Sequence, residues 1–273
     1  MSGESSGAGK GLLERLSEGP VICAEGYLFE LEHRGYVSAG AFVPEVVLEH
    51  PAAIEHLHRE FLRAGSYVVE EGVDGIIAET FSWSEIALDL IRQTGLPSVI
   101  TMAIHRDPET YEGLSPEDCC KRLEDAGADV VGLNCMPGPD TMLPMLRKIR
   151  LAVKCHVAAL PVPYRTSDAE LTFHHLHDEH CSCLPDGGTF PTALDPFTCN
   201  RYEIAEFAKE AVDIGIHYLG VCCGAKPHHI RSMAEALGRR PPASKYSPDM
   251  SKHAYFGDSD VISEEYRELS TRL

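Results

Sequence analysis

The sequence lacks any apolar run long enough to cross a bilayer, and its first ten residues, MSGESSGAGK, contain no apolar segment of a secretory signal. Basic residues are scarce: the chain has 24 Lys and Arg but 42 Asp and Glu, which gives a formal net charge of −18. Nucleic acids require a basic binding face, so this charge excludes them as the main partner. We expect a cytoplasmic protein that binds neither membrane nor nucleic acid.

Aromatic residues make up only 7% of the chain, with a single Trp at position 83. Few rings are therefore available to stack on sugars, which counts against a glycosidase that would use Glu25 and Glu79 as its acid–base pair. The dinucleotide motif GxGxxG and the phosphate-binding motif GxxxxGK[ST] are also absent. Hydrophobic residues nevertheless reach 44%, which is enough for a sizeable core.

Short apolar runs alternate along the chain with longer amphipathic ones, and no antiparallel hairpin signal separates them. The expected strands cover 21–25, 67–70, 73–79, 97–104, 128–135, 155–162 and 217–223. The expected helices cover 44–65, 84–95, 115–127, 140–150, 200–215 and 226–238. This repetition predicts an α/β fold with a parallel sheet, and without a dinucleotide motif it favours a (β/α)8 TIM-type barrel.

The barrel domain is expected to span residues 11–238. Residues 1–10 read as a flexible leader, and residues 239–273 as a polar, proline-broken tail that ends in a short helix. Inside the barrel, only Glu71 and Gly72 separate the second and third expected strands. A parallel crossover needs a dozen or more residues, so either one of the two is no strand or a piece of the fold is missing.

Cysteines stand at the ends of two expected strands. Cys135 ends one, and Cys222 and Cys223 end the last. Three interpretations remain open: small buried core residues, a strained vicinal disulfide, or thiolate ligands of a zinc ion that keeps its fourth position open. The cysteines at 119, 120, 155 and 199 are interpreted as core residues. The His-rich stretch at 174–183 is a second candidate for metal binding, with a solvated insertion as the alternative.

Two thiol motifs occur in order along the chain, GLNC at 132–135 and GVCCG at 220–224. Together they resemble the zinc-dependent homocysteine S-methyltransferases, and the likeness is greatest to betaine-dependent members. It covers most of residues 11–245 and extends over 11–19, 31–40, 44–66, 76–81, 126–135, 194–224 and 227–237.

The resemblance implies a homocysteine-binding (β/α)8 barrel with Zn²⁺ held by Cys135, Cys222 and Cys223. It implies homocysteine sulfur as the fourth ligand and methyl transfer to it from betaine or a related methylated onium donor, which gives methionine. It also implies that Glu79 binds the homocysteine amino group. A carboxylate suits an ammonium in that position.

The chain departs from the family in the substrate pocket. Ala24 takes the place of a substrate-contacting Asp and is followed by Glu25, while Phe42 replaces a Trp and Thr80 a Tyr. A cage for quaternary ammonium relies on such rings. Glu25 and Phe42 are therefore retained as candidate substrate contacts beside Glu79.

The family also has several tens of residues between 69 and 72 that this chain lacks. They include part of strand 2, strand 3 and their helices, so the barrel is expected to be incomplete. The short tail lacks most of the long arm that supports oligomers in the family, which weakens the expectation of a homo-oligomer. The alternative to a working enzyme is a non-catalytic or degenerate zinc-binding relative.

Overall fold

The computed structural model describes residues 10–24, 26–36, 46, 49–66, 75–80, 84–105, 109–110, 113–180, 182, 185–257, 262–270 and 272. The expected strand at 67–70 and the candidate substrate contacts Glu25 and Phe42 lie outside the described residues.

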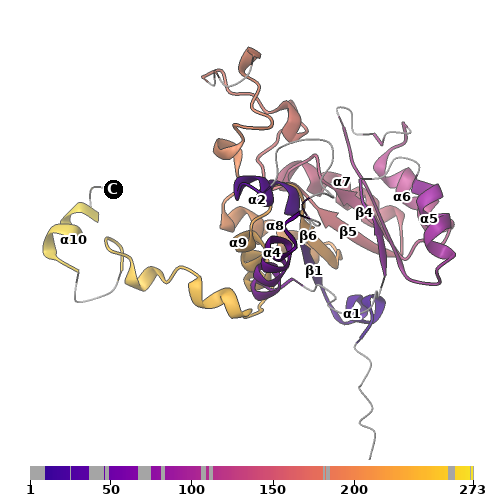
Figure 1. Cartoon of the computed structure of the whole chain (residues 1–273), viewed down its shortest axis with the longest axis horizontal. Helices are drawn as coiled ribbons and strands as arrows, with labels where there is room; N and C mark the ends of the chain where they lie inside the picture. Colours follow the sequence, from indigo (N-terminus) through magenta and orange to yellow (C-terminus); the bar gives the residue numbers. More distant parts are fainter. Residues whose placement is uncertain are drawn as a thin grey trace, which may run out of the picture.

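A single sheet of six parallel strands forms the centre of the described fold, and it curls on itself (Figure 1). The strands are β1 (Val21–Ala24), β2 (Ile76–Ala78), β3 (Ser98–Met102), β4 (Val130–Asn134), β5 (His156–Leu160) and β6 (Tyr218–Val221). Their order is β1-β6-β5-β4-β3-β2, and every pair is parallel. The α/β fold with a parallel sheet is confirmed, and each strand matches an expected one.

Helices alternate with the strands. They are α1 (Leu12–Glu18), α2 (Tyr27–His33), α4 (Pro51–Ala64), α5 (Ser84–Arg92), α6 (Pro116–Asp125), α7 (Pro139–Ala152), α8 (Arg201–Asp213), α9 (Pro227–Ala236) and α10 (Glu264–Ser270). Short 3-10 turns occur at η1 (Phe173–His175), η2 (Pro185–Gly187) and η3 (Asp195–Phe197), and after α9 at η4 (Pro242–Tyr246) and η5 (Met250–Lys252). Helices α1 and α2 were not expected. No helix in the described part of the chain could span a membrane.

The two faces of the sheet pack against different partners because successive strand residues point to opposite sides. On β4, Val131 and Leu133 belong to the large apolar cluster that the strands share with helices α4 to α9. Val130 points to the other side of the sheet and belongs to a second, inner apolar cluster. Leu16 of α1 joins this cluster at the amino ends of the strands. The opposite, carboxyl end of the interior is where Cys135 and Cys222 lie, in a third cluster.

The barrel is open on one side. Within the described residues, β1 pairs only with β6 and β2 only with β3, so these two strands are the edges of the sheet. Apolar side chains are exposed next to the β2 edge: Ile77 is 47% exposed, and Ile86 and Leu90 of α5 are 59% and 61% exposed. A closed barrel would cover such positions with the next strand–helix unit. The fold is therefore consistent with an incomplete barrel, while the identity of the missing strands stays a prediction.

Candidate metal centre

Three thiols converge at the carboxyl end of the sheet. The Sγ atoms of Cys135, Cys222 and Cys223 all lie within 4.8 Å of one another. The Sγ atoms of Cys222 and Cys223 are 3.9 Å apart, far beyond the roughly 2.05 Å of a disulfide bond, so the vicinal disulfide is absent. Cys135 and Cys222 are buried, at 5% and 4% exposure, and Cys223 is half-buried.

Backbone strain directs the first of these thiols. Cys135 and Met136 follow β4 with φ values of 58° and 57°, in the left-handed region that non-glycine residues seldom adopt. The Cys135 N–H donates to the Leu160 carbonyl oxygen at 2.9 Å, and the Met136 carbonyl accepts from Phe173 N–H at 3.1 Å. These bonds hold the turn after β4 against the end of β5 and against η1, and such strained turns are common at functional sites.

Glycine is required in the loop that carries the other two thiols. Gly224 has φ of 89°, and a Cβ placed there would lie 2.4 Å from the Tyr164 hydroxyl oxygen. The Cys222 N–H donates to the Pro161 carbonyl oxygen at 2.8 Å, and the Cys222 carbonyl accepts from Ala225 N–H at 3.0 Å. The loop is thus fixed to the end of β5 and closes tightly against Tyr164.

The thiols hydrogen-bond to one another, which separates their pKa values. Donation from Cys135, and then from Cys222, lowers the pKa of Cys223. The same contacts, with Cys222 and then Cys223, raise the pKa of Cys135 well above its usual value, and burial raises it further. Cys223 is therefore the sulfur of the cluster that most readily carries a negative charge, and three sulfurs together are the kind of donor set that a soft cation prefers.

Asn134, fully buried at the end of β4, connects this cluster to the end of β2. Its Nδ2 donates to Thr80 Oγ1 at 2.6 Å and lies 3.5 Å from Glu79 Oε2 and 3.9 Å from Cys222 Sγ. Its Oδ1 accepts from the Thr80 N–H at 2.9 Å. Thr80 has φ of 57°, so this bond holds a second strained turn. Sequence reasoning missed Asn134, although it stands inside the GLNC motif.

Glu79 follows β2 directly, and its Oε2 lies 3.5 Å from the Nδ2 of Asn134, the atom that also faces Cys222. Its side chain is exposed at the open side of the barrel. Ala24 is the last residue of β1. The structure thus brings Glu79 together with the three cysteines.

A pocket of about 250 Å³ opens beside the thiol loop, at Gly224 and Tyr164. It combines aromatic walls with charged side chains: Phe29, Glu32, Asp195 and Lys226 line it as well. The Tyr164 ring stacks on Phe173, with ring centres 5.6 Å apart. Burial, and then the nearby charges led by Cys223, raise the pKa of Tyr164, so its hydroxyl stays protonated.

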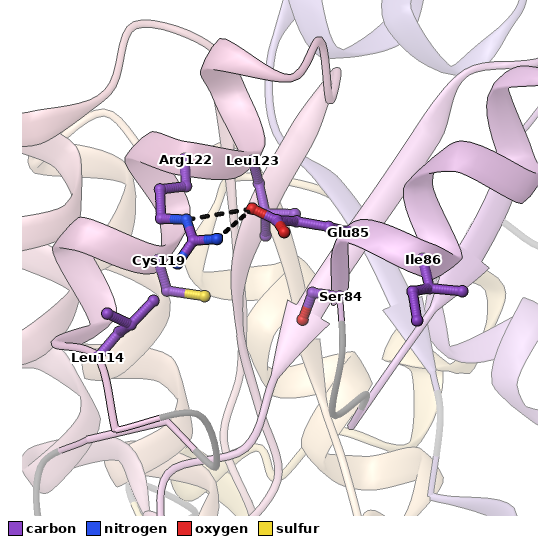
Figure 2. A pocket seen from close by; sticks show the side chains of 7 residues that line it. All are labelled: Ser84, Glu85, Ile86, Leu114, Cys119, Arg122 and Leu123. Carbon is purple, nitrogen blue, oxygen red and sulfur yellow. Dashed lines mark hydrogen bonds and ion pairs between the residues drawn. The ribbon is translucent and has the colours of Figure 1, made fainter.

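Another pocket, of about 200 Å³, lies between α5 and α6 and contains none of the three thiols (Figure 2). The Arg122 guanidinium donates to Glu85 Oε1 at 2.7 Å across it, and the Cys119 sulfur points toward it.

The His-rich stretch at 174–183, the second candidate for metal binding, lies in the η1–η2 region. Across the described residues, the three thiols form the one group of three or more metal-ligating side chains, and no histidine joins them.

The chain is similar to known proteins of one family. Residues 66–237 match the family model described as homocysteine S-methyltransferase. Betaine–homocysteine S-methyltransferase 1 of Danio rerio is 31% identical, over 92% of this chain and 81% of its own length. S-methylmethionine–homocysteine S-methyltransferase BHMT2 of Pongo abelii is 30% identical, over 93% of this chain and 88% of its own length.

Among solved structures, the oxidized form of the homocysteine methyltransferase MmuM from Escherichia coli superimposes with a TM-score of 0.54. The match covers 79% of this chain and 95% of that one at 12% identity, and it supports the fold alone. The alignment to the Danio rerio enzyme is 345 positions long, more than the 273 residues of this chain. That enzyme therefore carries internal residues that have no counterpart here.

Proposed function

The chain belongs to the homocysteine S-methyltransferase family, and from this premise we propose that it transfers a methyl group to the sulfur of homocysteine, giving methionine. The donor is betaine or a related methylated onium compound. The observation that carries the proposal is the convergence of the Cys135, Cys222 and Cys223 sulfurs within 4.8 Å at the carboxyl end of a parallel sheet. In barrels of this class the chemistry takes place at that end.

We propose Zn²⁺ as the cofactor, held by the three thiolates. Tetrahedral zinc with Zn–S bonds of about 2.3 Å would separate neighbouring sulfurs by roughly 3.8 Å. The 3.9 Å between the Sγ atoms of Cys222 and Cys223 fits this value. When bound, zinc lowers the pKa of a substrate thiol so that the thiol is present as a thiolate at neutral pH.

The reaction needs no general base from the protein once the substrate is a thiolate. The electron pair on the homocysteine sulfur forms the new S–CH₃ bond, and the donor keeps the pair of its broken N–CH₃ or S–CH₃ bond. The donor thereby loses its positive charge and leaves as a neutral amine or thioether. The protein's task is to align the two substrates and keep water away from the sulfur, for which the burial of Cys135 and Cys222 is suited.

Each substrate has a matching surface near the thiols. Glu79 is assigned to the ammonium group of homocysteine, and Asn134 acts as a positioning residue for it through the contact to Oε2. The pocket at Phe29 and Tyr164 is assigned to the donor, since aromatic rings and the carboxylate of Asp195 favour an onium cation. The non-catalytic alternative is not favoured, because the thiols and Glu79 are assembled at one place.

The test is methionine formation by the zinc-loaded full chain with homocysteine and, in separate reactions, betaine and S-methylmethionine. Product made from either donor, dependent on both homocysteine and zinc, supports the proposal, and the ratio of kcat/KM values identifies the donor. If neither donor yields methionine while zinc binds and the chain is folded, the proposed reaction is wrong.

Replacing Glu79 by Gln is expected to raise KM for homocysteine about 30-fold with a smaller change in kcat. The substitution removes a charge-assisted hydrogen bond to the ammonium, which is worth about 2 kcal/mol. Steady-state kinetics at saturating donor measure the effect. The matched control is Glu85→Gln, which removes an equal charge on α5 where the partner is Arg122. Equal KM values for the two variants would remove Glu79 from the substrate site.

A further inference from the structure

A groove of about 660 Å³ lies between α4, α9 and η4 and contains none of the three thiols. Basic side chains from all three elements line it, and those of two Arg and one Lys are cationic. Arg63 comes from the last turn of α4, His228 and Arg231 from the start of α9, and Lys245 from η4. Its volume is in the range of small-molecule sites.

Carboxylates do not neutralise these cations. Glu60 is the one acidic residue in the lining, and its carboxylate is already bound by Arg34 at 2.5 Å and by His56 at 2.9 Å. Among the described residues, Arg63, Arg231 and Lys245 make no ion pair. Arg231 donates to the Ala243 carbonyl oxygen at 3.2 Å, and Lys245 Nζ lies 4.9 Å from the centre of the Tyr246 ring.

Such a cluster is unusual in this chain, whose formal net charge is −18. Several cations elsewhere on its surface have a carboxylate partner, as Arg59 has in Glu55 at 2.5 Å and Arg122 has in Glu85. Burial lowers the pKa of His228, and repulsion from Arg201, Lys226 and Arg231 lowers it further, in keeping with a positive potential in the groove. The groove thus presents uncompensated positive charge to a ligand.

We propose that this groove binds a phosphate-bearing small molecule. Two guanidinium groups and an ammonium around one cavity match the charge and the several oxygens of a phosphate monoester, and the planar fork of Arg is suited to two of those oxygens at once. The Tyr246 ring, 69% exposed at the rim, offers a flat surface for an attached ring. The site is independent of methyl transfer, and no thiol takes part in it.

The test measures equilibrium binding of AMP, adenosine and inorganic phosphate to the full zinc-loaded chain. Calorimetry measures all three ligands, and ³¹P line broadening measures the two that contain phosphorus. Arg63→Gln is the main variant, because this side chain is exposed and its replacement is expected to leave the fold intact. Arg63→Gln/Lys245→Gln is the stronger variant. Arg59→Gln is the matched control, since it removes an equal charge from the same helix outside the groove.

Wild-type chain is expected to bind AMP and phosphate, with affinity that falls as salt rises from ~0.05 to ~0.5 M. Arg63→Gln is expected to weaken AMP binding about tenfold and the double variant more, while Arg59→Gln binds as wild type does. The proposal is overturned if neither phosphate compound binds, if adenosine binds as well as AMP, or if Arg59→Gln and Arg63→Gln lose equal affinity. None of these results depends on methyltransferase activity, so failure of one proposal leaves the other standing.

Discussion

Cys223→Ala is expected to lower kcat/KM for methyl transfer by about 1,000-fold or more and to release bound zinc. Cys223 supplies one of three sulfurs in the cluster, and its low pKa makes it the sulfur that carries negative charge most readily. Even changes to the groups that support metal ligands cost 10- to 100-fold in affinity or activity, so loss of a ligand should cost more. Metal analysis after dialysis and methionine formation measure the two effects on the same sample.

Cys155→Ala is the matched control for this prediction. Cys155 is also half-buried, but it lies directly before β5 and outside the cluster. Burial raises its pKa to about 12, so it stays a neutral thiol. This variant is expected to keep its zinc and its activity. Full activity in Cys223→Ala, or equal zinc loss in the two variants, would contradict the assignment of the ligands.

Gly132→Ala is expected to destabilise the chain by about 3 kcal/mol, at the upper end of the range for overpacking. A Cβ at this position would lie 2.1 Å from the Ala158 carbonyl oxygen of β5, and backbone atoms of a central strand have little room to move. Because Gly132 lies three positions before Cys135, the strain should also disturb the thiol cluster. Urea denaturation followed by circular dichroism measures the free energy of unfolding.

The control for this substitution is Gly11→Ala. Gly11 has an ordinary φ of −71°, and nothing lies within 4 Å of a Cβ placed on it. It is expected to change the free energy of unfolding by less than about 0.5 kcal/mol. If Gly132→Ala is as stable as Gly11→Ala, then β4 and β5 are not packed as closely as the structure has them.

The convergence of the thiols could be expected from the sequence, because the carboxyl ends of parallel strands meet at one end of a barrel. Cys135, Cys222 and Cys223 each follow a strand that periodicity identifies. The Asn134 bridge could not be expected in the same way. It depends on a left-handed turn at Thr80 and on the approach of β2 to within hydrogen-bond distance, which are tertiary features.

The open side of the barrel could be expected from the sequence, because the two residues between the second and third expected strands are too few for a parallel crossover. The structure places β1 and β2 at the two edges of the sheet and leaves Ile77 and Leu90 exposed beside one of them. Helices α1 and α2 escaped prediction because each has only seven residues and begins after a glycine with no side-chain cap. The groove between α4, α9 and η4 joins residues more than 150 positions apart, so no local pattern could reveal it.

Zinc-edge X-ray absorption of the metal-loaded chain, with and without homocysteine, tests the central claim most directly. The account predicts three sulfur ligands and one lighter ligand in the free protein, and four sulfurs once homocysteine is added. Histidine nitrogen among the zinc ligands would contradict the account. So would a zinc ion that still has only three sulfur ligands when homocysteine is saturating.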